Sequence, residues 1–517
     1  MANSSLTKRT GINIASQWAE QTAAIVVNFF LISYAIGKLG AEHYGGWAGI
    51  VSIIGFVSIL DSGMSVAIQH YVASLSAKKE EKRLAELFSS ACVVYAIGAV
   101  IATLICLGIS FYYPMLFPKV PAAAAVESQI ALRWVAAAMF IFMLNMPVRG
   151  ALLGLQRHDV RNMIEIVSLL TRAGAVVAAF HFFSPSLAHL GMGFFAATLI
   201  RFILSETALR RISGYLKFSV STAKRSDLKE IFSYSGHSMF WTVGRIVVQD
   251  SGPLIANITL TSTAATYVFV GSRLVTALGN FIAGVSGVFV PIASSLKALE
   301  DKTRLKIALI RGTRVCSLLG FAIAAVLLVF GRSILYHWVK FEDLTPYLVM
   351  CVLVAGRAPT WFFNIAFAML MGMRELWTIT LMLLISTVST IVLMFVLSYY
   401  YGVFGLAVGI IAPLSILYGT WIPYRVCRVT EVTIGRLLKE SMPWPLAVGT
   451  LVALFAYSIL NIFPPETVFV LIIEMGTSLA VFLVLALFVG LDRGTREAIR
   501  SQILLCSKKV ALLTFKR

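Results

Sequence analysis

About fourteen apolar runs, each of roughly 20 residues, follow one another along this sequence. A run of that length can cross a bilayer as an α-helix, because a helix satisfies its own backbone hydrogen bonds. Charged residues make up only 13% of the chain, about half the share found in soluble domains. The sequence therefore predicts an all-α membrane protein without a soluble domain. The predicted spans are residues 12–36, 44–72, 87–112, 130–154, 160–183, 187–209, 231–258, 264–293, 309–331, 345–371, 376–399, 403–424, 443–462 and 467–490.

Basic residues are distributed unevenly between the predicted spans. Most of the 43 Lys and Arg residues lie in every second connection and at the two chain ends. The other connections and their flanks hold only Lys38, Lys119, Arg133, Arg332 and Lys340. Cytoplasmic loops carry an excess of Lys and Arg, so the bias predicts that both termini are cytoplasmic. This topology, with contact to lipid head groups as a secondary role, explains the net charge of +19 without nucleic-acid binding.

Motifs for metal, redox or nucleotide chemistry are absent from the sequence. The six cysteines include no Cys-x-x-Cys pair, the seven histidines include no His-x-x-x-His pair, and there is no Walker A motif. We therefore expect no cofactor, no metal site and no enzymatic activity. A membrane-embedded glycan polymerase or transferase is a less favoured alternative, because the predicted external loops are short.

A weak internal repeat divides the predicted helices. Aligning the two halves pairs Trp18 with Trp241 and Tyr44 with Tyr267. Each half would contain six helices, an even number, so the repeat would be parallel about an axis along the membrane normal. The predicted divisions are a six-helix lobe at residues 1–211, a cytoplasmic linker at 212–230, a second six-helix lobe at 231–428, and two extra spans with a basic tail at 429–517.

Ionisable and polar residues occur inside several predicted spans, where a charge costs roughly 3 kcal/mol at mid-depth. His237, Trp241, Arg245 and Gln249 recur at helical spacing in the seventh span, followed directly by Asp250. The first span carries a similar polar stripe: Asn13, Gln17, Gln21 and Asn28, with Glu20 beside it. Such residues usually face a hydrated cavity or a partner side chain. For each charged residue, the alternative to a place in a hydrated cavity is a salt bridge that only stabilises helix packing.

Three short motifs carry a family resemblance. Residues 60–64 read Leu-Asp-Ser-Gly-Met, residues 84–89 read Leu-Ala-Glu-Leu-Phe-Ser, and residues 154–157 read Gly-Leu-Gln-Arg. In these motifs the chain resembles the oligosaccharide flippases, the Wzx or polysaccharide transporter family, of the multidrug/oligosaccharidyl-lipid/polysaccharide exporter superfamily. Ser62 departs from the pattern, which often has an apolar residue after the aspartate.

The resemblance implies two six-helix lobes around a central cavity that opens alternately to either side of the membrane. It implies a flippase in the bacterial inner membrane that moves polyprenyl-diphosphate-linked oligosaccharide to the periplasmic leaflet, for cell-surface polysaccharide biosynthesis. The implied partners are this lipid-linked substrate, the bilayer, H⁺ or Na⁺ as a coupling ion, and other polysaccharide-assembly membrane proteins. Two alternatives on the same fold are a multidrug/cation antiporter and a flippase for the peptidoglycan lipid precursor.

The implied substrate gives the intramembrane residues three predicted roles, each with a purely structural alternative. Arginine presents a rigid fork to phosphate oxygens, and the predicted diphosphate ligands are Arg245, Arg273, Arg172 and Arg357. The residues predicted to contact sugar or line the cavity are Trp18, Gln17, Gln21, Asn28, Trp241 and Gln249. The carboxylates predicted to exchange a coupling ion are Glu20, Asp61 and Asp250.

Overall fold

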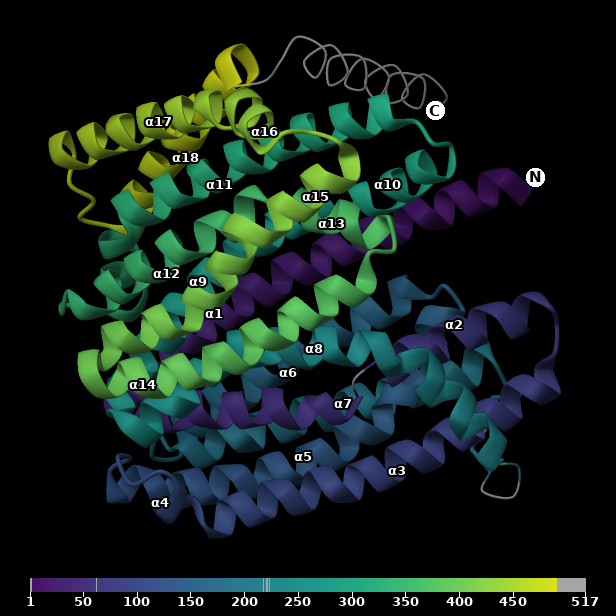
Figure 1. Cartoon of the computed structure of the whole chain (residues 1–517). Coiled ribbons are helices and arrows are strands. Elements are labelled where there is room, and N and C mark those ends of the chain that lie inside the picture. The colour runs from purple at the N-terminus through teal and green to yellow at the C-terminus, as the bar shows by residue number, and fades with distance from the viewer. Residues whose placement is uncertain (1, 62, 217, 220–221, 223, 491–517) are drawn as a thin grey trace, which may run out of the picture. The chain divides into compact units, whose positions relative to one another are not determined.

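The computed structural model describes residues 2–61, 63–216, 218–219, 222 and 224–490. Every regular element in these ranges is a helix, so the predicted all-α class is confirmed (Figure 1). Ten helices in the described ranges are long and apolar enough to cross a membrane. The protein is a multi-pass membrane protein.

Two of these ten helices each run from one predicted span into the next across a single glycine. Gly40 has a φ of 79° inside α1 (Ala2–Val57), and Gly402 has a φ of 61° inside α14 (Leu376–Ile416). Residues with a Cβ atom are strained at positive φ, whereas glycine adopts it readily. The chain can therefore change direction at one residue where the sequence predicted a short loop.

Other predicted spans are broken or more polar than the rest. The predicted span 345–371 is a pair of helices, α12 (Thr345–Phe362) and α13 (Asn364–Gly372), bent by 41°. The seventh predicted span corresponds to α8 (Arg225–Thr259), which is not among the ten apolar helices of the described ranges. With the two glycine breaks, the bent pair and α8, the helices agree with the predicted number of about fourteen.

The chain divides into two compact units. The first, Met1–Phe269 with Ile391–Leu406, is built around α5 (Ala122–Gly154), which packs against α3 (Glu81–Phe111) and α7 (Leu187–Ile212) (Figure 1). Small side chains such as Ala131 and Ala136 are fully buried on α5 and allow close helix packing. The other elements of this unit are α1, η1 (Ser58–Asp61), α2 (Met64–Ala77), α4 (Tyr113–Leu116), α6 (His158–Phe182), α8, the start of α9 (Ser262–Gly287) and the middle of α14.

Polar contacts hold the start of α8 against the start of α3. The Asp227 carboxylate is fully buried and accepts hydrogen bonds from Arg83 Nη1 at 2.7 Å and Ser90 Oγ at 3.0 Å. Lys224 Nζ donates to Glu86 Oε2 at 2.6 Å. These contacts attach part of the predicted linker to the first unit. The assignment of six helices to each lobe stays a prediction.

The second unit, Val270–Thr390 with Ala407–Arg517, is organised around α11 (Lys302–Val339). The two extra predicted spans, α17 (Pro443–Ile462) and α18 (Val468–Leu485), pack against α11. Phe330 of α11 forms a buried apolar cluster with Ala456 and Leu471. The remaining elements are α9 (Ser262–Gly287) from Val270 onward, α10 (Phe289–Ala298), α12, α13, the two ends of α14, α15 (Ile422–Thr430), α16 (Ile434–Ser441), and π-helical turns at Leu417–Trp421 and Ala486–Gly490.

Candidate functional site

The polar residues predicted on the first helix lie partly on an exposed face of α1. Gln17 and Gln21 are exposed, and the Trp18 side chain is 58% exposed. Asn28 is half-buried and donates from Nδ2 to the Ala24 carbonyl at 2.7 Å, a bond within its own helix. Polar side chains exposed along a membrane-spanning helix require water or a polar partner. Gln17, Trp18 and Gln21 therefore present a surface suited to a hydrophilic ligand.

Glu20 is half-buried on α1, in the neighbourhood of basic residues of other helices. It lies within electrostatic range of Arg161 on α6 and Arg201 on α7, and both of these lie within range of Arg149 on α5. Glu165 lies between the two, with Oε2 3.1 Å from Arg201 Nε and Oε1 3.9 Å from Arg161 Nη2. We call these five residues the arginine network.

Neutral side chains outside the arginine network form hydrogen bonds with two of its arginines. Arg161 Nη1 donates to Asn162 Oδ1 at 2.9 Å, and Arg201 Nη2 donates to Ser168 Oγ at 3.0 Å. Asn162 is in turn a donor to Ser16 Oγ on α1 at 3.0 Å. The predicted site included Glu20 but missed the three arginines and Glu165. One available sequence signal was the i, i+4 spacing of Arg161 and Glu165, which is also common in ordinary surface helices.

Arg245, the first predicted phosphate ligand, is exposed on α8. Its Nη1 donates to Gln249 Oε1 at 3.0 Å, one helical turn along. The neutral amide orients the guanidinium group without cancelling its charge. The structure thus brings Arg245 and Gln249 together, and both were predicted site residues. The side chain of Trp241, another predicted site residue, lies outside the described residues.

Asp250 lies close to the backbone of α1. A Cβ atom added at Gly55 would lie 2.8 Å from Asp250 Oδ2, closer than two such atoms can approach. A larger residue at position 55 would therefore require the Asp250 side chain to shift. Asn257 strengthens the same interface, because its Nδ2 donates to the Gly45 carbonyl at 2.8 Å. Asp250 has a packing role, and its predicted part in ion exchange stays a prediction.

Asp61 connects three elements of the first unit. Its carboxylate accepts hydrogen bonds from the Tyr95 hydroxyl of α3 and, at 3.0 Å, from Ser65 Oγ of α2. Tyr95 is only 1% exposed, so this bond lies inside the protein. Gly63, at a φ of 85°, allows the chain to turn from η1 into α2. These contacts provide the structural role that the sequence left open, and the ion-exchange role of Asp61 stays a prediction.

The other predicted arginines are distributed over both units. Arg172 on α6 belongs to the first unit, and its Cζ lies 6.0 Å from the centre of the Phe194 ring, as in a cation–π contact. Arg273 and Arg357, both half-buried, belong to the second unit. Arg357 lies within electrostatic range of the buried Tyr418 and forms no ion pair with a described carboxylate. The convergence of the four arginines on one ligand stays a prediction.

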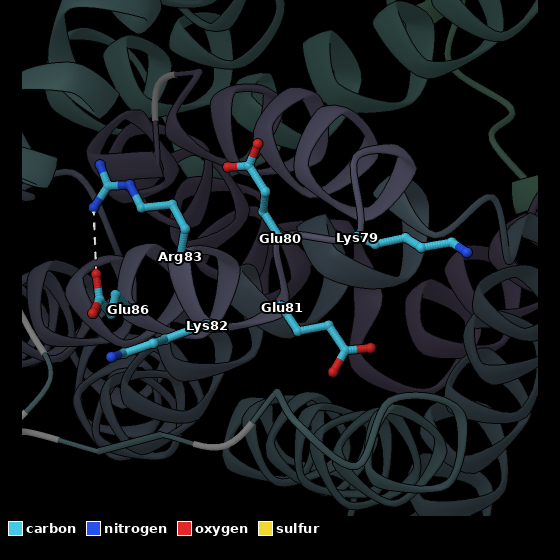
Figure 2. Close-up of a pocket in the computed structure, with 6 residues that line it drawn as sticks. All are labelled: Lys79, Glu80, Glu81, Lys82, Arg83 and Glu86. Carbon is cyan, nitrogen blue, oxygen red and sulfur yellow. Dashed lines mark ion pairs between the residues drawn. The ribbon is translucent and has the colours of Figure 1, made fainter.

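A charged hollow of about 590 Å³ lies at the connection between α2 and α3 (Figure 2). Figure 2 shows Arg83 directed toward Glu86, and Arg83 Nη1 lies 3.8 Å from Glu86 Oε2. Basic and acidic residues line the hollow in equal number, so their charges nearly cancel. Its lining is Lys79, Glu80, Glu81, Lys82, Arg83 and Glu86. This hollow is therefore a weaker candidate for an ionic ligand than the arginine network.

Side chains that bind metals do not gather within the described ranges. No group of three or more His, Cys, Asp or Glu residues there could hold an ion. Buried thiols such as Cys106 and Cys316 lie in different units. The polar side chains of the described residues can offer a ligand hydrogen bonds and charge, and both come chiefly from arginine.

Residues 6–297, more than half of the chain, match a protein family described as polysaccharide biosynthesis protein. The chain belongs to this family. A relative of this polysaccharide biosynthesis protein is the uncharacterized membrane protein EpsK of Bacillus subtilis (strain 168). The two are 21% identical over 340 residues, which cover 65% of this chain and 67% of EpsK.

Solved transporter structures share the fold of this polysaccharide biosynthesis protein. The lipid II flippase MurJ in an inward closed conformation matches with a TM-score of 0.69 at 12% identity, covering 92% of this chain and 97% of MurJ. An inward-facing multidrug resistance MATE family transporter of the MOP superfamily matches with a TM-score of 0.67 at 14% identity, covering 80% of this chain and 96% of that one. At these identities the similarity shows the fold, and together with the family match it confirms the predicted superfamily and its polysaccharide branch.

Proposed function

We propose that this polysaccharide biosynthesis protein is a flippase for polyprenyl-diphosphate-linked oligosaccharide. It would move this substrate from the cytoplasmic to the periplasmic leaflet of the bacterial inner membrane by alternating access, with both of its own termini in the cytoplasm. The observation that carries the proposal is the exposed guanidinium group of Arg245 on α8, which is oriented by the neutral amide of Gln249. A charge at such a position is costly in a membrane unless it faces water or binds an anion.

The substrate's chemistry suits the groups that the first unit exposes. A diphosphate requires cationic donors, and Arg245 supplies a fork of N–H groups with its charge intact. Oligosaccharides present hydroxyl groups and apolar ring faces, for which Gln17, Gln21 and Trp18 on α1 offer amide and aromatic partners. We therefore assign phosphate recognition to arginine and sugar contact to the exposed face of α1. H⁺ or Na⁺ exchange at Glu20, Asp61 or Asp250 remains part of the proposal.

An antiporter for cationic drugs fits these observations less well. Such a transporter requires acidic groups that are available to its substrate. Asp61 instead accepts two hydrogen bonds from neighbouring helices, and Asp250 packs against Gly55. Among the α8 side chains that the structure describes, the exposed charge is that of Arg245, so the geometry favours an anionic substrate.

Export of surface polysaccharide in cells tests the role of Arg245. In a strain that lacks the chromosomal copy, Arg245→Ala should reduce export at least about tenfold, since a charge-assisted hydrogen bond contributes about 1.5–3 kcal/mol. Arg210→Ala is the matched control, because Arg210 is 70% exposed and pairs with Glu206 of its own helix. Both variants have to be present in the membrane at the wild-type level. Unchanged export by Arg245→Ala would show that Arg245 does not hold the substrate.

A further inference from the structure

The arginine network of the first unit holds more positive than negative charge. Glu165 contacts the guanidinium groups of Arg161 and Arg201, and both arginines lie within electrostatic range of Glu20 and of Arg149. The ion-paired side chains are largely buried, with exposures of 19% for Arg161, 17% for Arg201 and 13% for Glu165. Like charges repel more strongly in such an environment than in water. The network therefore has one uncompensated positive charge, which favours a bound anion.

Some guanidinium N–H groups of the network make no hydrogen bond with a described residue. Nε of Arg161 and Nε of Arg201 are buried and make no hydrogen bond with a described residue, although the latter lies 3.1 Å from Glu165 Oε2. The half-buried Arg149 forms neither a hydrogen bond nor an ion pair with any residue in the described ranges. An unpaired buried donor is unfavourable, and an oxygen-rich anion supplies the acceptors that are missing here.

The two buried arginines are also held in fixed positions. Asn162 accepts a hydrogen bond from Arg161, and Ser168 accepts one from Arg201. Glu165 contacts both arginines and acts as the positioning residue between them. Donors fixed in advance bind an anion with little loss of conformational entropy. These neutral contacts orient the guanidinium groups and leave the excess charge unchanged.

We propose that Arg149, Arg161 and Arg201 form a binding site for a phosphate ester anion, separate from Arg245. Arg149 is the principal ligand, because its guanidinium group is not engaged elsewhere among the described residues. The inference rests on the proposed function, since it gives the substrate's diphosphate a second binding position. Arg149 lies near the end of α5 and Arg161 near the start of α6, the side proposed to be cytoplasmic. The site thus faces the leaflet from which the substrate starts.

Binding of inorganic pyrophosphate to the full-length protein tests this site. Isothermal titration calorimetry at low salt should give at least about tenfold weaker binding for Arg149→Gln, because one charge-assisted contact is lost. Glu20→Gln should tighten binding, since it removes a competing negative charge, and Arg210→Gln is the exposed control that should leave the Kd unchanged. The same Arg149 effect is expected in Arg245→Ala protein. A Kd that is unaltered by Arg149→Gln, or no binding by the wild type, would overturn the proposal.

Competition by a free head group distinguishes two sources of the phosphate. In nanodiscs of phosphatidylcholine, the site should bind pyrophosphate as it does in detergent. If glycerophosphoglycerol, the soluble head group of phosphatidylglycerol, does not displace pyrophosphate in these nanodiscs, the site prefers a diphosphate, as the lipid-linked substrate carries. If glycerophosphoglycerol displaces pyrophosphate at a comparable concentration, the ligand is a phospholipid head group, and the assignment to the substrate's diphosphate is overturned.

Failure of this inference can be distinguished from failure of the proposed function. A wild-type protein that binds pyrophosphate through Arg149 but moves no lipid-linked oligosaccharide would uphold the anion site and contradict the flippase. A protein that moves the substrate, but whose Kd for pyrophosphate is the same with and without Arg149→Gln, would contradict the anion site and leave the flippase proposal standing.

Discussion

At the scale of single residues, neutral partners orient charged side chains in the helices of the first unit. Gln249 accepts from Arg245, Asn162 accepts from Arg161, and Tyr95 donates to the Asp61 carboxylate. A neutral partner satisfies the geometry of a charged group but preserves its charge. A charged side chain whose charge is not neutralised by a partner can bind an ionic substrate or a coupling ion.

The hydrogen bond from Tyr95 to Asp61 should stabilise the first unit. Tyr95→Phe removes the hydroxyl and leaves a carboxylate that is short of one donor, so we expect the free energy of unfolding to fall by about 2 kcal/mol. Thermal unfolding of the detergent-purified protein measures the change. Tyr112→Phe is the control, because Tyr112 is 56% exposed and should tolerate the substitution. Equal melting temperatures for the two variants would contradict the structural role of this bond.

At the scale of elements, the sequence predicts helices well and their breaks and contacts poorly. Apolar length shows where a helix can cross the membrane, so the number of segments is largely predictable. A glycine such as Gly40 gives no sign that it has a positive φ, because glycine also occurs inside straight helices. Arg149 and Arg201 lie on different helices, and hydropathy does not show which helix faces meet. The contact between Arg245 and Gln249 could be predicted, because the two residues share one helical stripe.

The contacts between the starts of α3 and α8 give a prediction at this scale. Asp227→Ala leaves Arg83 and Ser90 without their shared acceptor, and the loss of hydrogen bonds to a charged acceptor costs about 1.5–3 kcal/mol. We expect a lower melting temperature and faster proteolysis between α7 and α8. Glu440→Ala removes an exposed ion pair with Arg436 and should cost less than about 1 kcal/mol. Equal effects of the two substitutions would contradict a stabilising role for the Asp227 contacts.

At the scale of the whole molecule, the asymmetry of basic residues predicts an orientation that labelling can check. In a variant without native cysteines, single cysteines at Ser186 and Glu466, between α6 and α7 and between α17 and α18, should react with an impermeant maleimide in intact spheroplasts. Cysteines at Ser76 and Glu300 should react only after the membrane is permeabilised. The opposite pattern would reverse the proposed topology and place the arginine network at the external leaflet.

The most direct measurement of the central claim is translocation of a fluorescent polyprenyl-diphosphate-linked oligosaccharide in proteoliposomes that contain only this protein. Accessibility of the sugar to a membrane-impermeant quencher reports the leaflet that the substrate occupies. We predict that wild-type protein equilibrates the substrate between leaflets, and that Arg245→Ala slows it at least about tenfold while Arg210→Ala does not. Substrate that stays in its original leaflet with correctly folded wild-type protein, under an imposed H⁺ or Na⁺ gradient as well as without one, would contradict the flippase.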